Sequence, residues 1–254
     1  MEGVGQLKIE APVIPTSEII AELELPIQNI LTQIQDRIDK REYGIIIGED
    51  ASGRIPGLIF GKFLKRLYET GEMSGKKVDH PETIFIPGKL EVLDNLRLAK
   101  ISLRKHLTKH GLEKGKRILI ATDTIASGES LKILTDLIKS LGFKVDIASI
   151  GVFPFMPDKT IRKNLGDSVI SGDYIRRNSQ SLPTRTPHIY NNKSISGVYK
   201  VSGETVSKSY KLKSYLSDEI KKKIQRTINE SRTEVDVLVD KLVDWYKTQG
   251  KEKS

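Results

Sequence analysis

Residues 117–130 read RILIATDTIASGES, which combines a short apolar run, an acid and a turn of small hydroxylated residues. Ile118–Ala121 are apolar without helical spacing, and this pattern is typical of a buried strand. After Gly128, apolar residues recur at helical spacing at Leu131, Leu134, Leu137, Ile138 and Leu141. The sequence therefore predicts a strand, a tight turn and a helix in direct succession.

The predicted turn is suited to binding an anion. The first backbone N–H groups of a helix have no intrahelical partner, and the helix dipole adds partial positive charge there. Ser127 and Ser130 can add hydroxyl donors, and Gly128 lets the backbone approach an anion closely. We therefore interpret this turn as a phosphate-binding loop.

Asp123 distinguishes this turn from an ordinary connection between a strand and a helix. We place it at the carboxyl end of the predicted strand, where its charge repels a phosphate unless the carboxylate has another use. Ribose hydroxyls and a bound Mg²⁺ are the natural partners for it. The alternative is that Asp123 caps the turn and Ser127 caps the helix.

A second turn of similar character follows an earlier apolar run at residues 43–48. Residues 49–56 read EDASGRIP, and Pro56 fits the first turn of a helix. Ser52, Gly53 and Arg54 can bind an anion through backbone N–H groups and a guanidinium. The preceding acids at 49–50 can hold Mg²⁺ through water, orient Arg54 or cap the helix. A surface salt bridge between Arg54 and one of these acids is the ordinary alternative.

The two segments, Ile118–Ser130 and Glu49–Pro56, resemble the type I phosphoribosyltransferase family. The family's signature for phosphoribosyl pyrophosphate (PRPP) is an apolar strand, two acids, three variable residues, Thr or Ser, Gly, any residue, and Thr or Ser. Asp123 matches the second acid, Ser127 and Gly128 match the central pair, and Ser130 matches the last position. Thr122 stands where the family has its first acid.

This resemblance implies a site for Mg²⁺ and PRPP, and transfer of the phosphoribosyl group to a base with release of pyrophosphate. It gives Asp123 and Arg54 catalytic roles, and Asp123 a contact to Mg²⁺ through water. Phe153 and Phe155 would form part of a base-binding wall, although aromatic residues beside prolines often serve local packing. The residues implied to bind PRPP are Ser52, Gly53, Arg54, Asp123, Thr124, Ala126, Ser127, Gly128, Glu129 and Ser130.

The composition limits the function classes. The chain has 254 residues, no cysteine, four histidines and a formal net charge of +9. Disulfide and thiolate chemistry are excluded, and the scattered histidines do not suggest a zinc site. The charge favours anionic partners, with nucleic acid a less favoured one than small phosphorylated molecules. With no signal pattern and no membrane-spanning run, we expect a cytoplasmic protein without a membrane contact. We also expect a homodimer.

Alternating strands and helices predict an α/β fold with a doubly wound, mainly parallel sheet flanked by helices, as in the type I phosphoribosyltransferases. We divide the chain into an N-terminal arm and amphipathic helix at 1–42, a phosphoribosyltransferase-like core with a possible hood at 43–205, and a C-terminal helical arm at 206–254. Residues 1–25 are expected to form an extended arm or a short strand. Thr122 keeps a second hypothesis open, namely a non-catalytic regulator that responds to PRPP or binds nucleic acid. A sugar-phosphate-binding protein unrelated to PRPP is a third.

Overall fold

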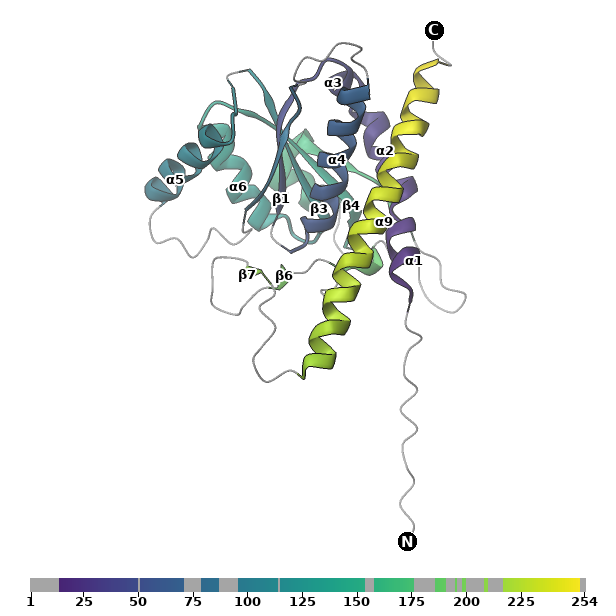
Figure 1. Ribbon diagram of the computed structural model, residues 1–254. Helices are drawn as coiled ribbons and strands as arrows, with labels where there is room; N and C mark the ends of the chain where they lie inside the picture. Colours follow the sequence, from purple (N-terminus) through teal and green to yellow (C-terminus); the bar gives the residue numbers. More distant parts are fainter. Residues whose placement is uncertain are drawn as a thin grey trace.

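A computed structural model describes residues 14–49, 51–70, 79–86, 96–113, 115–153, 158–175, 186–190, 195, 198–199, 208–209 and 217–251 (Figure 1). Its centre is a sheet of five parallel strands in the order β2-β1-β3-β4-β5. The strands are β1 (Tyr43–Glu49), β2 (Glu82–Ile86), β3 (Arg117–Ile125), β4 (Lys144–Val152) and β5 (Val169–Ser171). The predicted fold class is confirmed.

The strand order reverses direction between β1 and β3. The chain passes from β1 to β2 on one side, returns past β1 to β3, and continues to β4 and β5. Gly48 of β1 pairs with Ala121 of β3, so β3 continues four residues beyond this pair, to Ile125. Asp123 therefore lies within the strand and not at its end, which corrects the prediction from the apolar run alone.

Alternation along the strands divides the core into two layers. Ile46, Leu119 and Ile150 face one side of the sheet, where α1 (Thr16–Ala21), α2 (Glu24–Gln33), α3 (Gln35–Asp39), α4 (Arg54–Thr70) and α9 (Asp218–Lys251) supply buried side chains. Ile45 and Ile47 face the other side, which α5 (Leu96–Lys109), α6 (Glu129–Ser140) and α7 (Asp158–Leu165) cover. Because successive strand side chains point to opposite faces, a continuous apolar run fills both layers.

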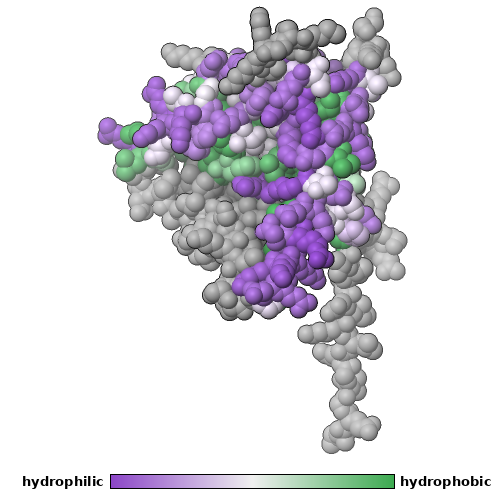
Figure 2. Space-filling model, in the orientation of Figure 1, coloured by the Kyte–Doolittle hydropathy of each residue, from purple (hydrophilic) through white to green (hydrophobic). Residues whose placement is uncertain are grey.

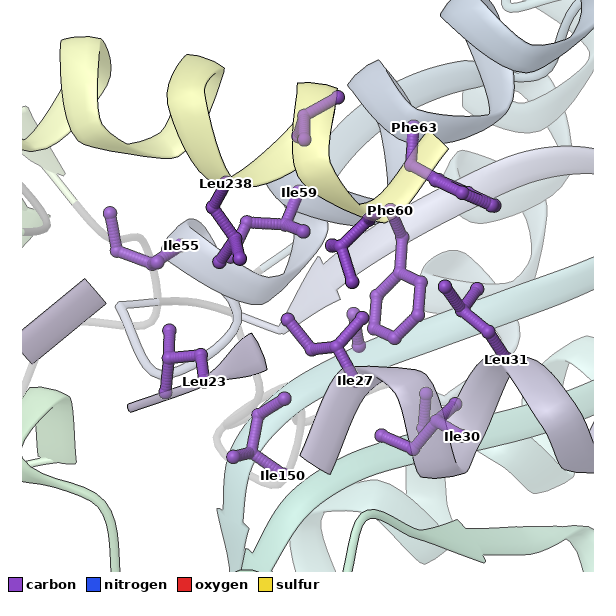
Figure 3. Close-up of a cluster of buried hydrophobic side chains, with 14 of the residues drawn as sticks. Leu23, Ile27, Ile30, Leu31, Ile55, Ile59, Phe60, Phe63, Ile150 and Leu238 are labelled. Atoms are coloured by element: carbon purple, nitrogen blue, oxygen red, sulfur yellow. The ribbon is translucent and has the colours of Figure 1, made fainter. Parts of the chain in front are cut away.

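The first layer is made by segments from both ends of the described chain. Figure 3 shows Ile27 beside the Phe60 ring of α4 and Leu238 of α9 beside Ile59, and Leu23 belongs to the same buried cluster. Part of the predicted N-terminal arm is therefore the helix α1, because its isoleucines at 19 and 20 are buried in this core. Within the predicted C-terminal arm at 206–254, the helix α9 runs from Asp218 to Lys251, and residues 208–209 form a short strand.

The remaining described elements are short. They are the 3-10 turns η2 (Gly166–Ser168) and η3 (His188–Tyr190), and the strands β6 (Val198–Tyr199) and β7 (Lys208–Ser209), which pair with each other in an antiparallel ladder. Glu22, at the end of α1, holds η3 in place. Its carboxylate accepts the backbone N–H of His188 at 2.6 Å and the hydroxyl of Tyr174 at 2.8 Å.

Figure 2 shows a hydrophilic surface along the first half of α9. Among the helices that the structure describes, none has the length and apolar character needed to span a membrane.

Candidate functional site

The two predicted anion-binding turns meet at the point where the strand order reverses. One follows β1, and the other follows β3, its direct neighbour in the sheet. The backbone N–H of Asp123 donates to the carbonyl oxygen of Ser52 at 3.2 Å, which links the two segments directly. In doubly wound sheets the ligand crevice lies outside the carboxyl ends of the strands at such a switch point. The sheet therefore brings the two turns to one location.

Only glycine fits at position 53, because the backbones of β1 and β3 lie very close to its Cα atom. A Cβ atom at this position would lie 2.1 Å from the Glu49 nitrogen and 2.2 Å from the Ala121 carbonyl oxygen. The Gly53 N–H donates to the Glu49 carbonyl oxygen at 2.7 Å, and the Gly53 carbonyl accepts the Gly57 N–H at 2.8 Å. The glycine thus lets the turn close against β3 before α4 begins.

Thr122 has a defined partner in the neighbouring strand. Its hydroxyl donates to Oε2 of Glu49 at 3.3 Å, and both side chains are buried. The position where the related family has its first acid is therefore a hydroxyl beside a carboxylate from β1. This contact was absent from our sequence interpretation, because nothing in the sequence indicates which residue of β1 faces Thr122.

Arg54 begins α4 and lies half-buried against β2. Its guanidinium carbon is 4.0 Å from the centroid of the Phe85 ring, and its Nε is buried without a hydrogen-bond partner in the described part of the chain. Burial lowers the pKa of Arg54 below its ordinary value. Arg54 forms no ion pair with any of the described residues, so the alternative of a salt bridge to Glu49 is wrong. Asp50, the other acid of that alternative, lies outside the described residues.

Asp123 and Thr124 are buried at this edge. Asp123 exposes 3% of its surface and Thr124 exposes 8%. η3 lies against β3, and the Ser231 hydroxyl of α9 donates to the Ile195 carbonyl oxygen at 2.9 Å. The turn η3, which follows the sheet in sequence, therefore packs against β3.

The turn after β3 has the predicted strand-turn-helix geometry. Ala126 and Glu129 are exposed, and Ser127 and Ser130 are half-exposed. The Ser127 hydroxyl oxygen accepts the Glu129 N–H at 3.4 Å. The N-cap residue of α6 is Gly128, so the alternative that Ser127 caps the helix is wrong.

Gly128 is explained by local geometry as well. Its φ of +78° lies in the left-handed region, which favours glycine, and an added Cβ would lie 3.0 Å from Leu165. Asn164, which our sequence interpretation missed, donates from its side-chain amide to the Ser127 carbonyl oxygen at 2.7 Å. An amide at the end of a short amphipathic helix gives no signal of such a contact in the sequence.

Of the two aromatic residues predicted for the base wall, the structure describes Phe153. Phe153 directly follows β4, and its N–H donates to the Ile125 carbonyl oxygen at 2.9 Å. This bond places it beside the turn that follows β3. Phe155 lies outside the described residues.

A resident metal has little support from the protein side chains. Within the ranges that the structure describes, no group of three or more His, Asp or Glu side chains is arranged to hold a metal ion. Mg²⁺ commonly keeps several waters and binds through one or two carboxylates together with substrate phosphates. Asp123 fits such a supporting role better than the role of a main ligand.

Comparison with known proteins finds partial similarity to two phosphoribosyltransferases. No protein-family profile matches the chain. The adenine phosphoribosyltransferase of Mycoplasma mobile is 34% identical over 105 residues, which are 41% of this chain and 56% of that enzyme. A purine phosphoribosyltransferase structure from Pyrococcus horikoshii covers 52% of this chain and 78% of its own, with 21% identity and a TM-score of 0.30.

The fold and the site define a doubly wound α/β protein with two turns meeting at the switch point of its sheet. The chain is similar in sequence, over 105 residues, to an enzyme of the family that the motifs resemble. Because the chain spans only 56% of the length of that relative, the enzyme's name describes the relative alone.

Proposed function

We propose that this protein is a phosphoribosyltransferase that binds PRPP with Mg²⁺ and transfers the phosphoribosyl group to a ring nitrogen of a nucleobase. The observation that carries this proposal is the direct link between the two turns, in which the Asp123 N–H donates to the Ser52 carbonyl. PRPP carries a monophosphate and a pyrophosphate on opposite sides of a ribose, so a pair of anion-binding turns beside a carboxylate suits it.

Each turn has a proposed part of the ligand. The backbone N–H groups of residues 126–130, with the Ser127 and Ser130 hydroxyls, bind the 5′-phosphate. Thr124, near the end of β3, and Glu129, the first residue of α6, flank this turn. Asp123 binds a ribose hydroxyl. Ser52, Gly53 and Arg54 bind the pyrophosphate. The half-exposed Ser127 and Ser130 and the exposed residue Ala126 support the first of these assignments.

In the proposed reaction the bond between the anomeric carbon and the pyrophosphate oxygen breaks, and a bond from the same carbon to the base nitrogen forms. Positive charge develops on the ribose, and negative charge develops on the leaving pyrophosphate. Arg54 offsets that negative charge, and its partial burial strengthens the interaction because water screens it less. Mg²⁺ would contribute by neutralising pyrophosphate oxygens, with Asp123 holding it through water.

The base is proposed to bind near Phe153, whose backbone is fixed beside the phosphate turn. Adenine is the first candidate, since the related Mycoplasma enzyme is named for it. The cytoplasm is the proposed location, and a homodimer remains a prediction that sedimentation can test.

Turnover tests this proposal. We expect release of pyrophosphate from Mg²⁺ and PRPP with at least one base from a panel led by adenine. Arg54→Gln and Asp123→Asn should each lower kcat/KM by at least about a hundredfold, because each removes a charged contact that forms in the transition state. Arg104→Gln, on the exposed side of α5, is the matched control and should keep full activity. Absence of turnover with every base would contradict the proposal.

The buried contact of Thr122 with Glu49 favours one second function, a PRPP-responsive regulator without catalysis. If this alternative holds, the protein binds Mg²⁺ and PRPP without releasing pyrophosphate. Binding to duplex DNA or RNA that weakens steeply with salt would then support a nucleic-acid role.

A further inference from the structure

The turn η3 packs on the side of the sheet that the Asp123 side chain faces. Asp123 is two residues beyond Ala121, and the register of β3 with β4 places it opposite Ile150. Ala121 and Ile150 both lie in the first core layer, so strand alternation directs the Asp123 side chain to that layer. Ile189 of η3 is buried in the same layer, and η3 contacts β3.

Glu22 ties η3 to the end of α1 with both of its carboxylate oxygens. Oε1 accepts the backbone N–H of His188 at 2.6 Å, and Oε2 lies 2.6 Å from Nδ1 of the same residue. An ionised carboxylate only accepts hydrogen bonds, so we assign the proton of the second contact to Nδ1. The Glu22 side chain is 17% exposed and that of His188 is 25% exposed, so water screens these contacts only in part.

The same carboxylate binds a residue beside β4. Oε2 of Glu22 accepts the Tyr174 hydroxyl at 2.8 Å. The Tyr174 N–H donates to the Ile150 carbonyl oxygen at 3.2 Å, which places Tyr174 at the level of Asp123 in the sheet. Tyr174 is buried in the first core layer. One carboxylate therefore joins the end of α1, η3 and the chain that follows β5.

We propose that Glu22 is a positioning residue of the PRPP site, and that it holds η3 over the buried carboxylate of Asp123. This inference rests on the proposed function and deepens it, because it adds a residue that neither sequence motif contains. Asp123 exposes 3% of its surface, and a carboxylate shielded from water binds a hydroxyl more strongly than an exposed one. Loss of Glu22 releases η3, so water reaches Asp123 and the affinity for the ribose falls.

The two turns of the site should respond differently to Glu22. Asp123 is proposed to bind the ribose, so the contact of Glu22 with η3 affects ligands that contain ribose. The turn after β1 is proposed to bind the pyrophosphate. Among the described residues, the Glu22 carboxylate contacts His188 and Tyr174, and neither belongs to that turn. Binding of pyrophosphate alone should therefore be independent of Glu22.

Calorimetric titration of the full chain with Mg²⁺ and PRPP, ribose 5-phosphate or pyrophosphate tests this inference. Glu22→Ala should weaken binding of PRPP and ribose 5-phosphate by about tenfold or more, and should change pyrophosphate affinity less than about twofold. Glu22→Gln keeps an acceptor oxygen, and its amide can donate to Nδ1 of the other His188 tautomer, so it should retain most of the affinity. Glu18→Ala removes the same charge at an exposed position of α1 and should bind all three ligands as the wild type does.

The outcomes separate this inference from the proposed function. If the wild type binds PRPP and Glu22→Ala binds it equally well, Glu22 does not position the site and the proposed function stands. An equal loss of pyrophosphate affinity in Glu22→Ala would also contradict the inference, because it would show general damage to the protein. If the wild type does not bind PRPP, both proposals are wrong.

Tyr174→Phe provides the test if Glu22→Ala does not fold. This variant removes one of the three hydrogen bonds to the Glu22 carboxylate. We expect it to lower the affinity for ribose 5-phosphate by about threefold without changing the affinity for pyrophosphate. Wild-type affinity for both ligands would contradict the inference.

Discussion

Gly53 allows the turn after β1 to lie directly against β3. Since any Cβ here would overlap the backbone of Glu49 and Ala121, we expect Gly53→Ala to lower the free energy of unfolding by about 2 kcal/mol or more. Urea unfolding measures this loss, with Ser52→Ala as the control at the neighbouring half-exposed position. Equal stability of the two variants would show that the junction is looser than described.

Thr122 illustrates how a departure from a family motif can be compensated locally. Its hydroxyl lies 3.3 Å from a carboxylate oxygen of Glu49, so Thr122→Asp would place two buried carboxylates together. We expect this variant to lose about 2 kcal/mol of stability at neutral pH, and less near pH 5, where one carboxylate can take up a proton.

Glu49→Gln is the second half of that test. Combined with Thr122→Asp it should recover most of the lost stability, since an amide replaces one of the two charges. A double-mutant cycle on the free energy of unfolding measures the coupling. Additive effects of the two substitutions would mean that the side chains do not interact.

At the scale of elements, the ion pairs between α4 and α9 hold the C-terminal helix in place. Asp236 contacts both Lys62 and Arg66, and we expect Asp236→Asn to lower the free energy of unfolding by about 1 kcal/mol. Asp244→Asn, at an exposed position of the same helix, should have little effect. The difference should shrink in about 1 M salt, because these pairs are partly exposed and screened. A difference independent of salt would assign the effect to packing.

For the whole molecule, buried tyrosines make stability depend on alkaline pH. Burial raises the pKa of Tyr68 to about 12, and it also raises the pKa values of Tyr43 and Tyr246. An unfolded tyrosine releases its proton near pH 10, so above that value the unfolded chain binds fewer protons than the native protein. Stability is therefore fully present below about pH 10 and falls as the pH rises toward about 12.

Tyr68→Phe tests that dependence. The variant loses the hydrogen bond from the Tyr68 hydroxyl to the Ile38 carbonyl, which costs about 1 kcal/mol below pH 10. In return, the fall in stability between pH 10 and 12 should involve about one proton fewer. Urea unfolding across this pH range checks both effects. A slope equal to that of the wild type would show that Tyr68 ionises normally in the folded protein.

The sequence was sufficient to predict the strands of the sheet and the turn that follows β3. Continuous apolar runs identify buried parallel strands, and Ile118–Ala121 followed by helical spacing after Gly128 predicted β3 and α6 correctly. The length of β3 was underestimated, because Thr122, Asp123 and Thr124 are polar although buried. The helix α1 was not predicted, because the prolines at 12 and 15 suggested an extended segment. The burial of α1 depends on its packing against distant elements, including α9, which the sequence does not reveal.

Contacts between distant elements were beyond sequence reasoning. The pairing of Thr122 with Glu49 has no signal in the sequence, since it requires the order of the strands. The spacing of Asp236 and Asp240 by four residues does show that they share one helix face, but not that this face meets α4.

The central claim is that the turns after β1 and β3 form one PRPP site. Calorimetric titration with Mg²⁺ and PRPP of the wild type, Arg54→Gln and Asp123→Asn tests it most directly, with each variant altering one side of the junction. We expect one molecule of PRPP to bind per chain, with affinity reduced by about tenfold or more in both variants while both remain folded. Wild-type affinity in both variants, or no binding to the wild type, would contradict the claim.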